Sequence, residues 1–287
     1  MTDFNSNYPS PLVIRGIMPR SGTVFLGECL ALHPAVDAYP NDIWEFTPCR
    51  TMPALHAYLD RIPHPRHTDR VKPEEVLKHM GEGWLSYLYQ YADRSKRLLL
   101  KYPSVEALSD FMALWPTARI VAIVRDGRDV VASGLKAGFV APPPFRLSVK
   151  SSWRRLVQPS DFTVLCQRYS AAVDRLLAFE RQLNSQTASR YLRVRFEDLH
   201  GETEATVRHV LEWADLDPDA YDWAALSALP VKGSSYLRDK TESIDFEQGR
   251  QKTNTFNPVG RWQTWSKRHK GIFEREAGNA LRELGYG

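Results

Sequence analysis

The sequence predicts an α/β protein with three layers, in which helices flank a central, mostly parallel sheet. Four times along the 287 residues, an apolar and β-branched run passes through a turn into a stretch of helical periodicity. Parallel strands need crossover connections, and these place helices on both faces of the sheet. The composition, 43% hydrophobic and 25% charged, is ordinary for a soluble globular protein with a large core.

The four strand–helix units point to one edge of the sheet as the place for a ligand. In chain order, the predicted strands and their helices are 12–17 with 23–32, 97–101 with 104–114, 119–125 with 127–137, and 191–196 with 203–213. Such a sheet binds ligands at the carboxyl ends of its strands. The residues found there are Arg20, Lys101, Arg125 and Glu197. Three of the four are cationic, which favours an anionic ligand.

The first unit has the pattern of a phosphate cradle. A strand feeds a helix through a tight loop that holds Arg20, Ser21 and Gly22, and the helix begins at Thr23. Such a turn aims unpaired backbone N–H groups and the positive helix end at one point, where an anion can bind. Arg20 adds a planar fork, and the hydroxyls of Ser21 and Thr23 add donors. The alternative is an ordinary strand-to-helix turn, because short glycine motifs are weak alone.

The rest of the chain predicts loops and packing elements around this sheet. A helix is expected over 163–183 and a final one from 261 toward 284. We expect one domain, 1–287, with lid or acceptor-binding insertions at about 40–95 and 138–160. A loop at about 230–262 is expected to close over the ligand.

Composition excludes several other classes of protein. No apolar stretch approaches the roughly 20 residues of a membrane span, and the N-terminus lacks a secretory pattern, so we expect a cytoplasmic protein without membrane contact. The net charge of +4 suits an anionic ligand, but the bases are too scattered for nucleic-acid binding. Cys29, Cys49 and Cys166 are widely spaced and odd in number, which predicts reduced thiols.

A second block of sequence narrows the class of ligand. A strand ends at Arg125, and Ser133 follows eight residues later in the next helix. With the loop 19–23, this block closely resembles the PAPS-dependent sulfotransferases, and bacterial and tyrosylprotein-like members above all. Further similarities are the segments 101–104, 195–199, 232–235 and 256–262, in the family's order. The resemblance runs from about residue 12 to residue 262 and implies a P-loop-like fold.

The resemblance implies a residue set around the co-substrate 3′-phosphoadenosine-5′-phosphosulfate (PAPS). The first loop would hold the 5′-phosphosulfate, Arg125 and Ser133 the 3′-phosphate, and the loop near Arg261 would close over that phosphate. The implied cofactor-binding residues are Arg20, Ser21, Gly22, Thr23, Val24, Arg125, Ser133, Phe196, Ser234, Ser235 and Arg261. Phe196 stands where the family has tyrosine, so ring stacking survives but a hydroxyl hydrogen bond does not.

Three residues are the catalytic candidates that the resemblance implies at the reacting sulfonate. Arg20 would bind the sulfonate and the bridging oxygen, Lys101 would steady the transition state, and Ser234, or Ser235 by one register, would line the site. A surface salt bridge for Arg20 and a solvated strand end for Lys101 are the structural alternatives. Glu197 and Asp198 are expected to cap or brace the following helix and not to act in catalysis. Arg128 either assists the phosphate clamp or pairs with a neighbouring acid such as Asp129.

The resemblance implies that the general base lies in residues 36–46, although the family's Glu-Thr dipeptide is absent there. A carboxylate or histidine would take the proton of the attacking group. Asp42 is favoured, then Glu45, and His33 third, because a histidine before proline at a helix end is more often structural. The departure from the family pattern puts the class of acceptor in doubt.

The predicted reaction is transfer of the sulfonate of PAPS to a hydroxyl or amine of a small-molecule acceptor by in-line displacement, which releases PAP. A sulfuryl group carries less charge than a phosphoryl group, so fixed cations and N–H donors suffice and no metal is expected. The magnesium-binding P-loop pattern is absent, since Thr23 follows Gly22 with no lysine between them.

Two other functions stay open at this stage. One is a P-loop nucleotide kinase or another phosphotransferase, which shares the cradle. The other is a non-catalytic, sulfotransferase-like protein that binds an anion. The acceptor is not predicted by any motif, and the assembly state, a homodimer included, stays open.

Overall fold

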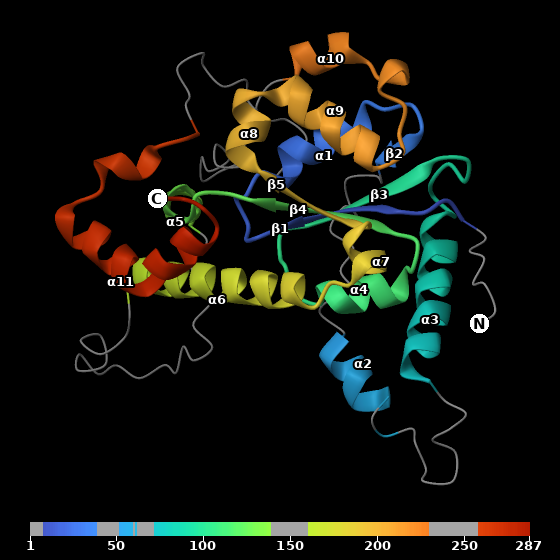
Figure 1. Cartoon of the computed structure of the whole chain (residues 1–287), viewed down its shortest axis with the longest axis horizontal. Helices are drawn as coiled ribbons and strands as arrows, with labels where there is room; N and C mark the ends of the chain where they lie inside the picture. Colours follow the sequence, from blue (N-terminus) through green and yellow to red (C-terminus); the bar gives the residue numbers. More distant parts are fainter. Residues whose placement is uncertain (1–7, 39–51, 60, 62–71, 139–159, 230–257) are drawn as a thin grey trace, which may run out of the picture.

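A five-stranded parallel sheet forms the centre of the protein (Figure 1). The structure is a computed structural model that describes residues 8–38, 52–59, 61, 72–138, 160–229 and 258–287. The strands are β1 (Leu12–Gly16), β2 (Val36–Ala38), β3 (Arg97–Tyr102), β4 (Arg119–Val124) and β5 (Tyr191–Arg195). Their order is β2-β3-β1-β4-β5, and every neighbouring pair is parallel. The predicted fold class is confirmed.

Helices cover both faces of the sheet. One face carries α1 (Thr23–Ala31), α8 (Phe196–Gly201), α9 (Thr203–Trp213) and α10 (Trp223–Ala228), above the sheet in Figure 1. The other face carries α3 (Pro73–Leu88), α4 (Leu108–Leu114), α5 (Gly127–Lys136), α6 (Asp161–Arg181) and α11 (Lys267–Glu283). The short elements are α2 (Met52–Leu59), α7 (Ser185–Ala188) and the 3₁₀ turns η4 (Pro218–Ala220) and η6 (Arg261–Thr264).

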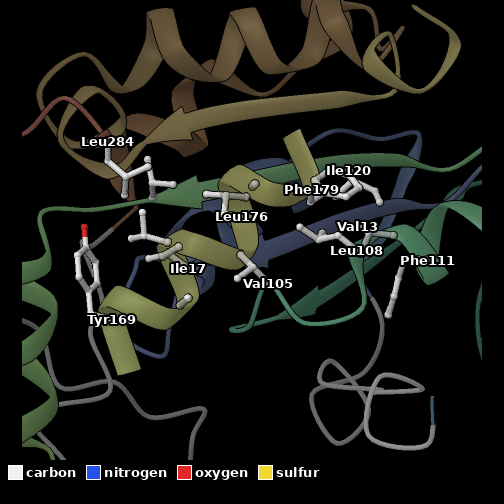
Figure 2. Close-up of a cluster of buried hydrophobic side chains, with 14 of the residues drawn as sticks. Val13, Ile17, Val105, Leu108, Phe111, Ile120, Tyr169, Leu176, Phe179 and Leu284 are labelled. Carbon is white, nitrogen blue, oxygen red and sulfur yellow. The ribbon is translucent and has the colours of Figure 1, made fainter. Parts of the chain in front are cut away.

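The alternation of side chains along the strands divides the core into two layers. On β1, Leu12 and Ile14 pack in the cluster with α1 and α9, whereas Val13 packs in the cluster with α4 and α6. Figure 2 shows part of the second cluster, with Val13 and Ile120 of the sheet against Phe179 of α6. Strands that are buried on both faces need continuous apolar runs, which is the pattern that revealed them in the sequence.

The four predicted strand–helix units are present, and one helix begins later than expected. The predicted helix 104–114 starts at Leu108. The guanidinium of Arg15, which is fully buried on β1, donates to the carbonyl oxygens of Ser104 and Glu106. Those two oxygens are therefore used by a side chain instead of by a helical turn.

Part of the segment expected as a lid or acceptor-binding insertion packs in the core. Within the predicted insertion at about 40–95, α3 buries Leu85 and Leu88, and the indole of Trp115 donates to the Gly81 carbonyl at 2.9 Å. A Cβ at Gly81 would lie 2.0 Å from the Leu114 oxygen, so α3 and α4 touch through backbone. Composition alone did not reveal this close packing, and a lid or acceptor-binding role for the insertion stays a prediction. The predicted insertion at 138–160 and the closing loop up to residue 257 lie almost wholly outside the described residues.

Two further expectations concern membrane spans and cysteines. Among the described helices, none is long and apolar enough to cross a bilayer. Cys29 and Cys166 are free, buried thiols, as predicted, and burial raises the pKa of each to about 12. Cys49 lies outside the described residues.

Candidate anion-binding site

The candidate site lies at the carboxyl ends of β1 and β4, which are neighbours at the centre of the sheet. After β1 the chain enters α1 on one face, and after β4 it enters α5 on the other face. Doubly wound sheets bind ligands at such a point, where neighbouring strands lead to helices on opposite faces. The N–H of Ile17 donates to the Ile123 oxygen at 3.0 Å and joins the two strand ends.

The loop 17–22, here called the cradle loop, is closed by its own serine. The Ser21 hydroxyl donates to the Met18 oxygen at 2.6 Å and accepts from the Met18 N–H at 3.0 Å. Ser21 is fully buried, and the backbone at Arg20 and Gly22 has φ of 81° and 101°. The serine therefore shapes the loop, a role that the sequence did not predict, and its contact with an anion stays a prediction.

The first turn of α1 keeps its backbone donors unused. The helical hydrogen bonds begin with the Leu26 N–H on the Gly22 oxygen. Within the described part of the chain, no oxygen accepts from the N–H of Thr23 or Val24. A Cβ at Gly22 would lie 2.3 Å from Phe196 Cδ2, so only glycine permits this close approach of the helix to the ring. The result is a helix N-terminus that is suited to an anion.

Arg125 connects the cradle loop to a distant segment of the chain. Its Nη1 donates to the Arg20 oxygen at 2.8 Å and its Nη2 to the Pro258 oxygen at 2.6 Å. The guanidinium lies 4.2 Å from the centre of the Phe196 ring. Its Nε is buried and finds no acceptor among the described residues. A buried, charged donor without a partner is costly, which indicates that an anion completes the site.

Three guanidinium groups and one hydroxyl gather at this point. Arg20 Nε donates to the Ser133 hydroxyl at 3.0 Å, so the predicted sulfonate residue and the predicted phosphate residue touch. Burial, together with the charges of Arg125 and Arg261, lowers the pKa of Arg20 to about 10. Burial also lowers the pKa of Arg125. This mutual repulsion is the expected state of a site that is built for a multiply charged anion.

The described part of the predicted closing loop docks on α5. Both oxygens of Asp129, which is fully buried, accept backbone N–H groups, from Gly260 at 2.8 Å and from Arg261 at 2.7 Å. The guanidinium of Arg128 lies 3.9 Å from the centre of the Trp262 ring. Arg261 thereby lies near Arg20 and Arg125, and its contact with a phosphate stays a prediction.

The turn between β4 and α5 is braced by side chains from α8 and α6. Glu197 accepts the Asp126 N–H at 3.0 Å on one oxygen and the Tyr286 hydroxyl at 2.7 Å on the other. The Tyr169 hydroxyl donates to the Arg125 oxygen at 3.2 Å. Glu197 is structural, as expected, but it braces the β4–α5 turn and not the helix that follows it in the chain.

Comparison with known proteins agrees with this geometry. A sequence model of the sulfotransferase family matches residues 11–220, well over half of the chain. The chain belongs to the sulfotransferase family. Among solved structures, the sulfotransferase domain of the olefin synthase of Synechococcus PCC 7002 has a TM-score of 0.58 and 18% identity, over 100% of this chain and 98% of that one. The sulfotransferase domain from the curacin biosynthetic pathway has a TM-score of 0.54 and 15% identity, over 98% and 99%. These likenesses concern the fold. No curated protein sequence matches the chain.

Lys101 of this sulfotransferase is a buried residue of the sheet. It lies on β3 in register with Ile14 of β1 and is 7% exposed. By strand alternation it shares the face of Leu99, which packs in the cluster of α1. A solvated strand-end lysine is therefore the wrong interpretation, and a contact of Lys101 with the sulfonate stays a prediction.

Two side chains whose roles the sequence left open have structural partners. His33 lies at the far end of α1, where Nδ1 accepts the Ala35 N–H at 3.1 Å and Nε2 lies 3.0 Å from the Asp217 oxygen. Both ring nitrogens are used and the side chain is buried, so His33 is structural and not the base. Arg128 pairs with Asp126 at 2.7 Å instead of with Asp129, whose oxygens are taken by the closing loop.

Four predicted site residues lie outside the described part of the chain, and one residue of the site was not predicted. Asp42, Glu45, Ser234 and Ser235 lie outside the described residues. Among those described, no group of three or more His, Cys, Asp or Glu side chains could hold a metal ion. The sequence missed Asp129 as a loop anchor. A signal existed, because Asp129 and Ser133 are four residues apart on α5 and therefore share one face of that helix.

Proposed function

We propose that this sulfotransferase moves the sulfonate of PAPS to a hydroxyl or amine of a small-molecule acceptor and releases PAP. The observation that carries the proposal is the cluster of Arg20, Arg125, Arg261 and Ser133 beside a helix N-terminus with unused donors. The buried Arg125 Nε without a partner among the described residues fits a phosphate oxygen. A nucleotide with phosphates at two separated positions would use both the cluster and the helix end.

The residues divide the work between binding and reaction. Arg125, Ser133 and Arg261 would hold the 3′-phosphate, and Phe196 would support Arg125 from below. Thr23 and Val24 would direct their N–H groups at the 5′-phosphosulfate. Gly22, which has no side chain, would leave room for that group. This division places fixed donors at each end of the nucleotide before any reaction begins.

Arg20 and Lys101 would stabilise the charge that develops during transfer. The acceptor atom forms a bond to sulfur while the bond from sulfur to the bridging phosphate oxygen breaks, so negative charge grows on that oxygen. The proton of the acceptor passes to a base, for which we propose Asp42 and then Glu45. Ser234, or Ser235, would line the sulfonate. No metal takes part in this proposal.

Two experiments test the proposal in sequence. Purified protein should bind PAP in calorimetry with EDTA present, because cations and N–H groups supply the site. Protein that binds magnesium-ATP tightly and has no affinity for PAP would be a phosphotransferase instead. Labelled PAPS and a metabolite extract from the protein's own source should then give a product that is heavier by one sulfonate in mass spectrometry.

The non-catalytic alternative is separated by Arg20→Ala and Lys101→Ala. An enzyme should lose roughly 100-fold in turnover when a charge stabiliser is removed. A protein that only binds the anion should show weaker affinity and no turnover in any variant. Arg175→Ala is the matched control, since Arg175 is more than half exposed and only pairs weakly with Glu106 at 3.8 Å.

A further inference from the structure

The segment 258–264, here called the strap, meets Arg125 and the first turn of α5. Arg125 Nη2 donates to the Pro258 oxygen, Asp129 accepts the N–H groups of Gly260 and Arg261, and Arg128 covers the Trp262 ring. Consecutive contacts of this kind fix the strap in position and in orientation. The strap lies about 130 residues farther along the chain than α5, so the contact is entirely tertiary.

We infer that Asp129 is the positioning residue of this site, which caps the strap from another element and so places Arg261 among the guanidinium groups. This inference rests on the proposed function for its binding readout. Asp129 itself meets neither the nucleotide nor the acceptor in this account, because both of its oxygens are occupied by the strap backbone.

The first argument is the chemistry of the cap. The 3₁₀ turn η6 begins after Gly260, whose φ of 79° is accessible to glycine, and no side chain of the strap caps it. The first N–H groups of such a turn need acceptors from elsewhere. A carboxylate can offer two oxygens to two N–H groups, whereas an amide offers one oxygen and turns an NH₂ toward the other donor.

The second argument is electrostatic. Arg261 is close enough to Arg20 and Arg125 to lower the pKa of each, so an undocked strap would relieve repulsion. The charge of Asp129 favours the protonated form of Arg125 and opposes that repulsion. A bound dianion would act in the same direction. Docking of the strap and binding of a dianion should therefore stabilise each other, as linkage requires.

The third argument separates this role from catalysis. Asp129 acts on the position of the strap, which contacts the phosphate clamp, and not on the reacting sulfonate. Its loss should raise KM for PAPS and the Kd for PAP while kcat at saturating PAPS stays within about twofold. A residue that only stabilised the fold would lower the denaturation midpoint without this KM-against-kcat division.

The test is amide hydrogen exchange of the strap in Asp129→Asn, combined with PAP titration. The strap amides of Gly260 and Arg261 should exchange at least about tenfold faster than in the wild type, and the Kd for PAP should rise about 10- to 100-fold. Asp222→Asn is the matched control: Asp222 caps α10 by accepting the Ala225 N–H at 2.9 Å and lies far along the chain. It should leave the strap and the Kd unchanged.

Arg261→Ala keeps the test decisive if Asp129→Asn fails to fold. It removes the guanidinium but keeps the N–H that Asp129 accepts. We expect the strap to stay protected while PAP binds more weakly. If the strap loses protection in Arg261→Ala, the side chain and not Asp129 holds it, and the inference is overturned. Unchanged exchange in a folded Asp129→Asn overturns it as well. If wild-type protein does not bind PAP, the proposed function falls, but the exchange comparison still reports on Asp129.

Discussion

The cradle loop and the β4–α5 turn carry arginines to the same point but are stabilised in different ways. The β4–α5 turn is tied by Tyr169, Glu197, Phe196 and the strap, and most of its groups are used. The cradle loop is closed mainly by Ser21 and leads into a helix whose first donors are unused among the described residues. A segment that holds a ligand in place is more rigid when its hydrogen-bonding groups are already paired. A reacting end needs donors that are free to meet charge that appears only in the transition state.

The largest expected effect is the loss of turnover on changing Arg20. Arg20→Gly and Arg20→Ala should both lower kcat/KM by about 100-fold or more, because the charge stabiliser is gone. The backbone at Arg20 has φ of 81°, which glycine adopts more easily than alanine. The free energy of unfolding, measured in urea, should therefore be about 1 kcal/mol higher for Arg20→Gly than for Arg20→Ala. Equal stability of the two variants would contradict the strained cradle loop. The control is Arg175→Ala, for which both quantities should match the wild type.

Gly22→Ala should disturb both regions together. The new Cβ would lie 2.3 Å from the Phe196 ring that supports Arg125, and φ is 101°. We expect a loss of about 2 kcal/mol or more in the free energy of unfolding, measured in urea. PAP affinity should fall as well, since the ring must shift under Arg125. Gly83→Ala, at a position with open space around it, is the control, and a similar loss there would speak against a specific overlap.

The pH dependence of PAP affinity should distinguish Arg20 of the cradle loop from the arginine of the β4–α5 turn. Because burial and two like charges lower the pKa of Arg20 to about 10, PAP affinity should be constant from pH 7 to 9 and fall as the pH passes about 10. The sign for stability is opposite: a cation whose pKa is lowered by folding costs stability while it is charged. That cost declines as the pH rises from about 10 toward the ordinary pKa of arginine. Calorimetry across this range checks the affinity. Arg20→Ala should remove the step, and a step that persists there would assign it to another group.

The smallest effect is expected for Tyr286→Phe. The variant removes the hydroxyl that Glu197 accepts, which should cost about 1 kcal/mol of stability. Cys166 and Cys29 report on the two layers of the core, since each is buried in a different one. At low denaturant, Tyr286→Phe should raise the alkylation rate of Cys166, which lies in the same layer as Tyr286, more than that of Cys29. Equal acceleration at both would mean that the two layers open as one unit.

The sequence predicted the features that depend on local pattern. Apolar, β-branched runs located four of the five strands, and the block around Arg125 placed that residue at a strand end with Ser133 in the following helix. Features that depend on distant partners were missed. The Ser21 hydroxyl turns into its own loop, Arg15 delays a helix that lies some 90 residues on, and Asp129 anchors the strap. The three residues of β2 were too few to show a pattern.

The most direct test is the affinity for adenosine 3′,5′-bisphosphate against that for adenosine 5′-monophosphate, by calorimetry in EDTA, in wild type and Arg125→Gln. The two ligands differ only in the phosphate that we assign to Arg125, Ser133 and Arg261. The wild type should prefer the bisphosphate by about 10-fold or more, and Arg125→Gln should lose most of that preference. Equal affinity of the wild type for both nucleotides would contradict the assignment of the arginine cluster to the 3′-phosphate.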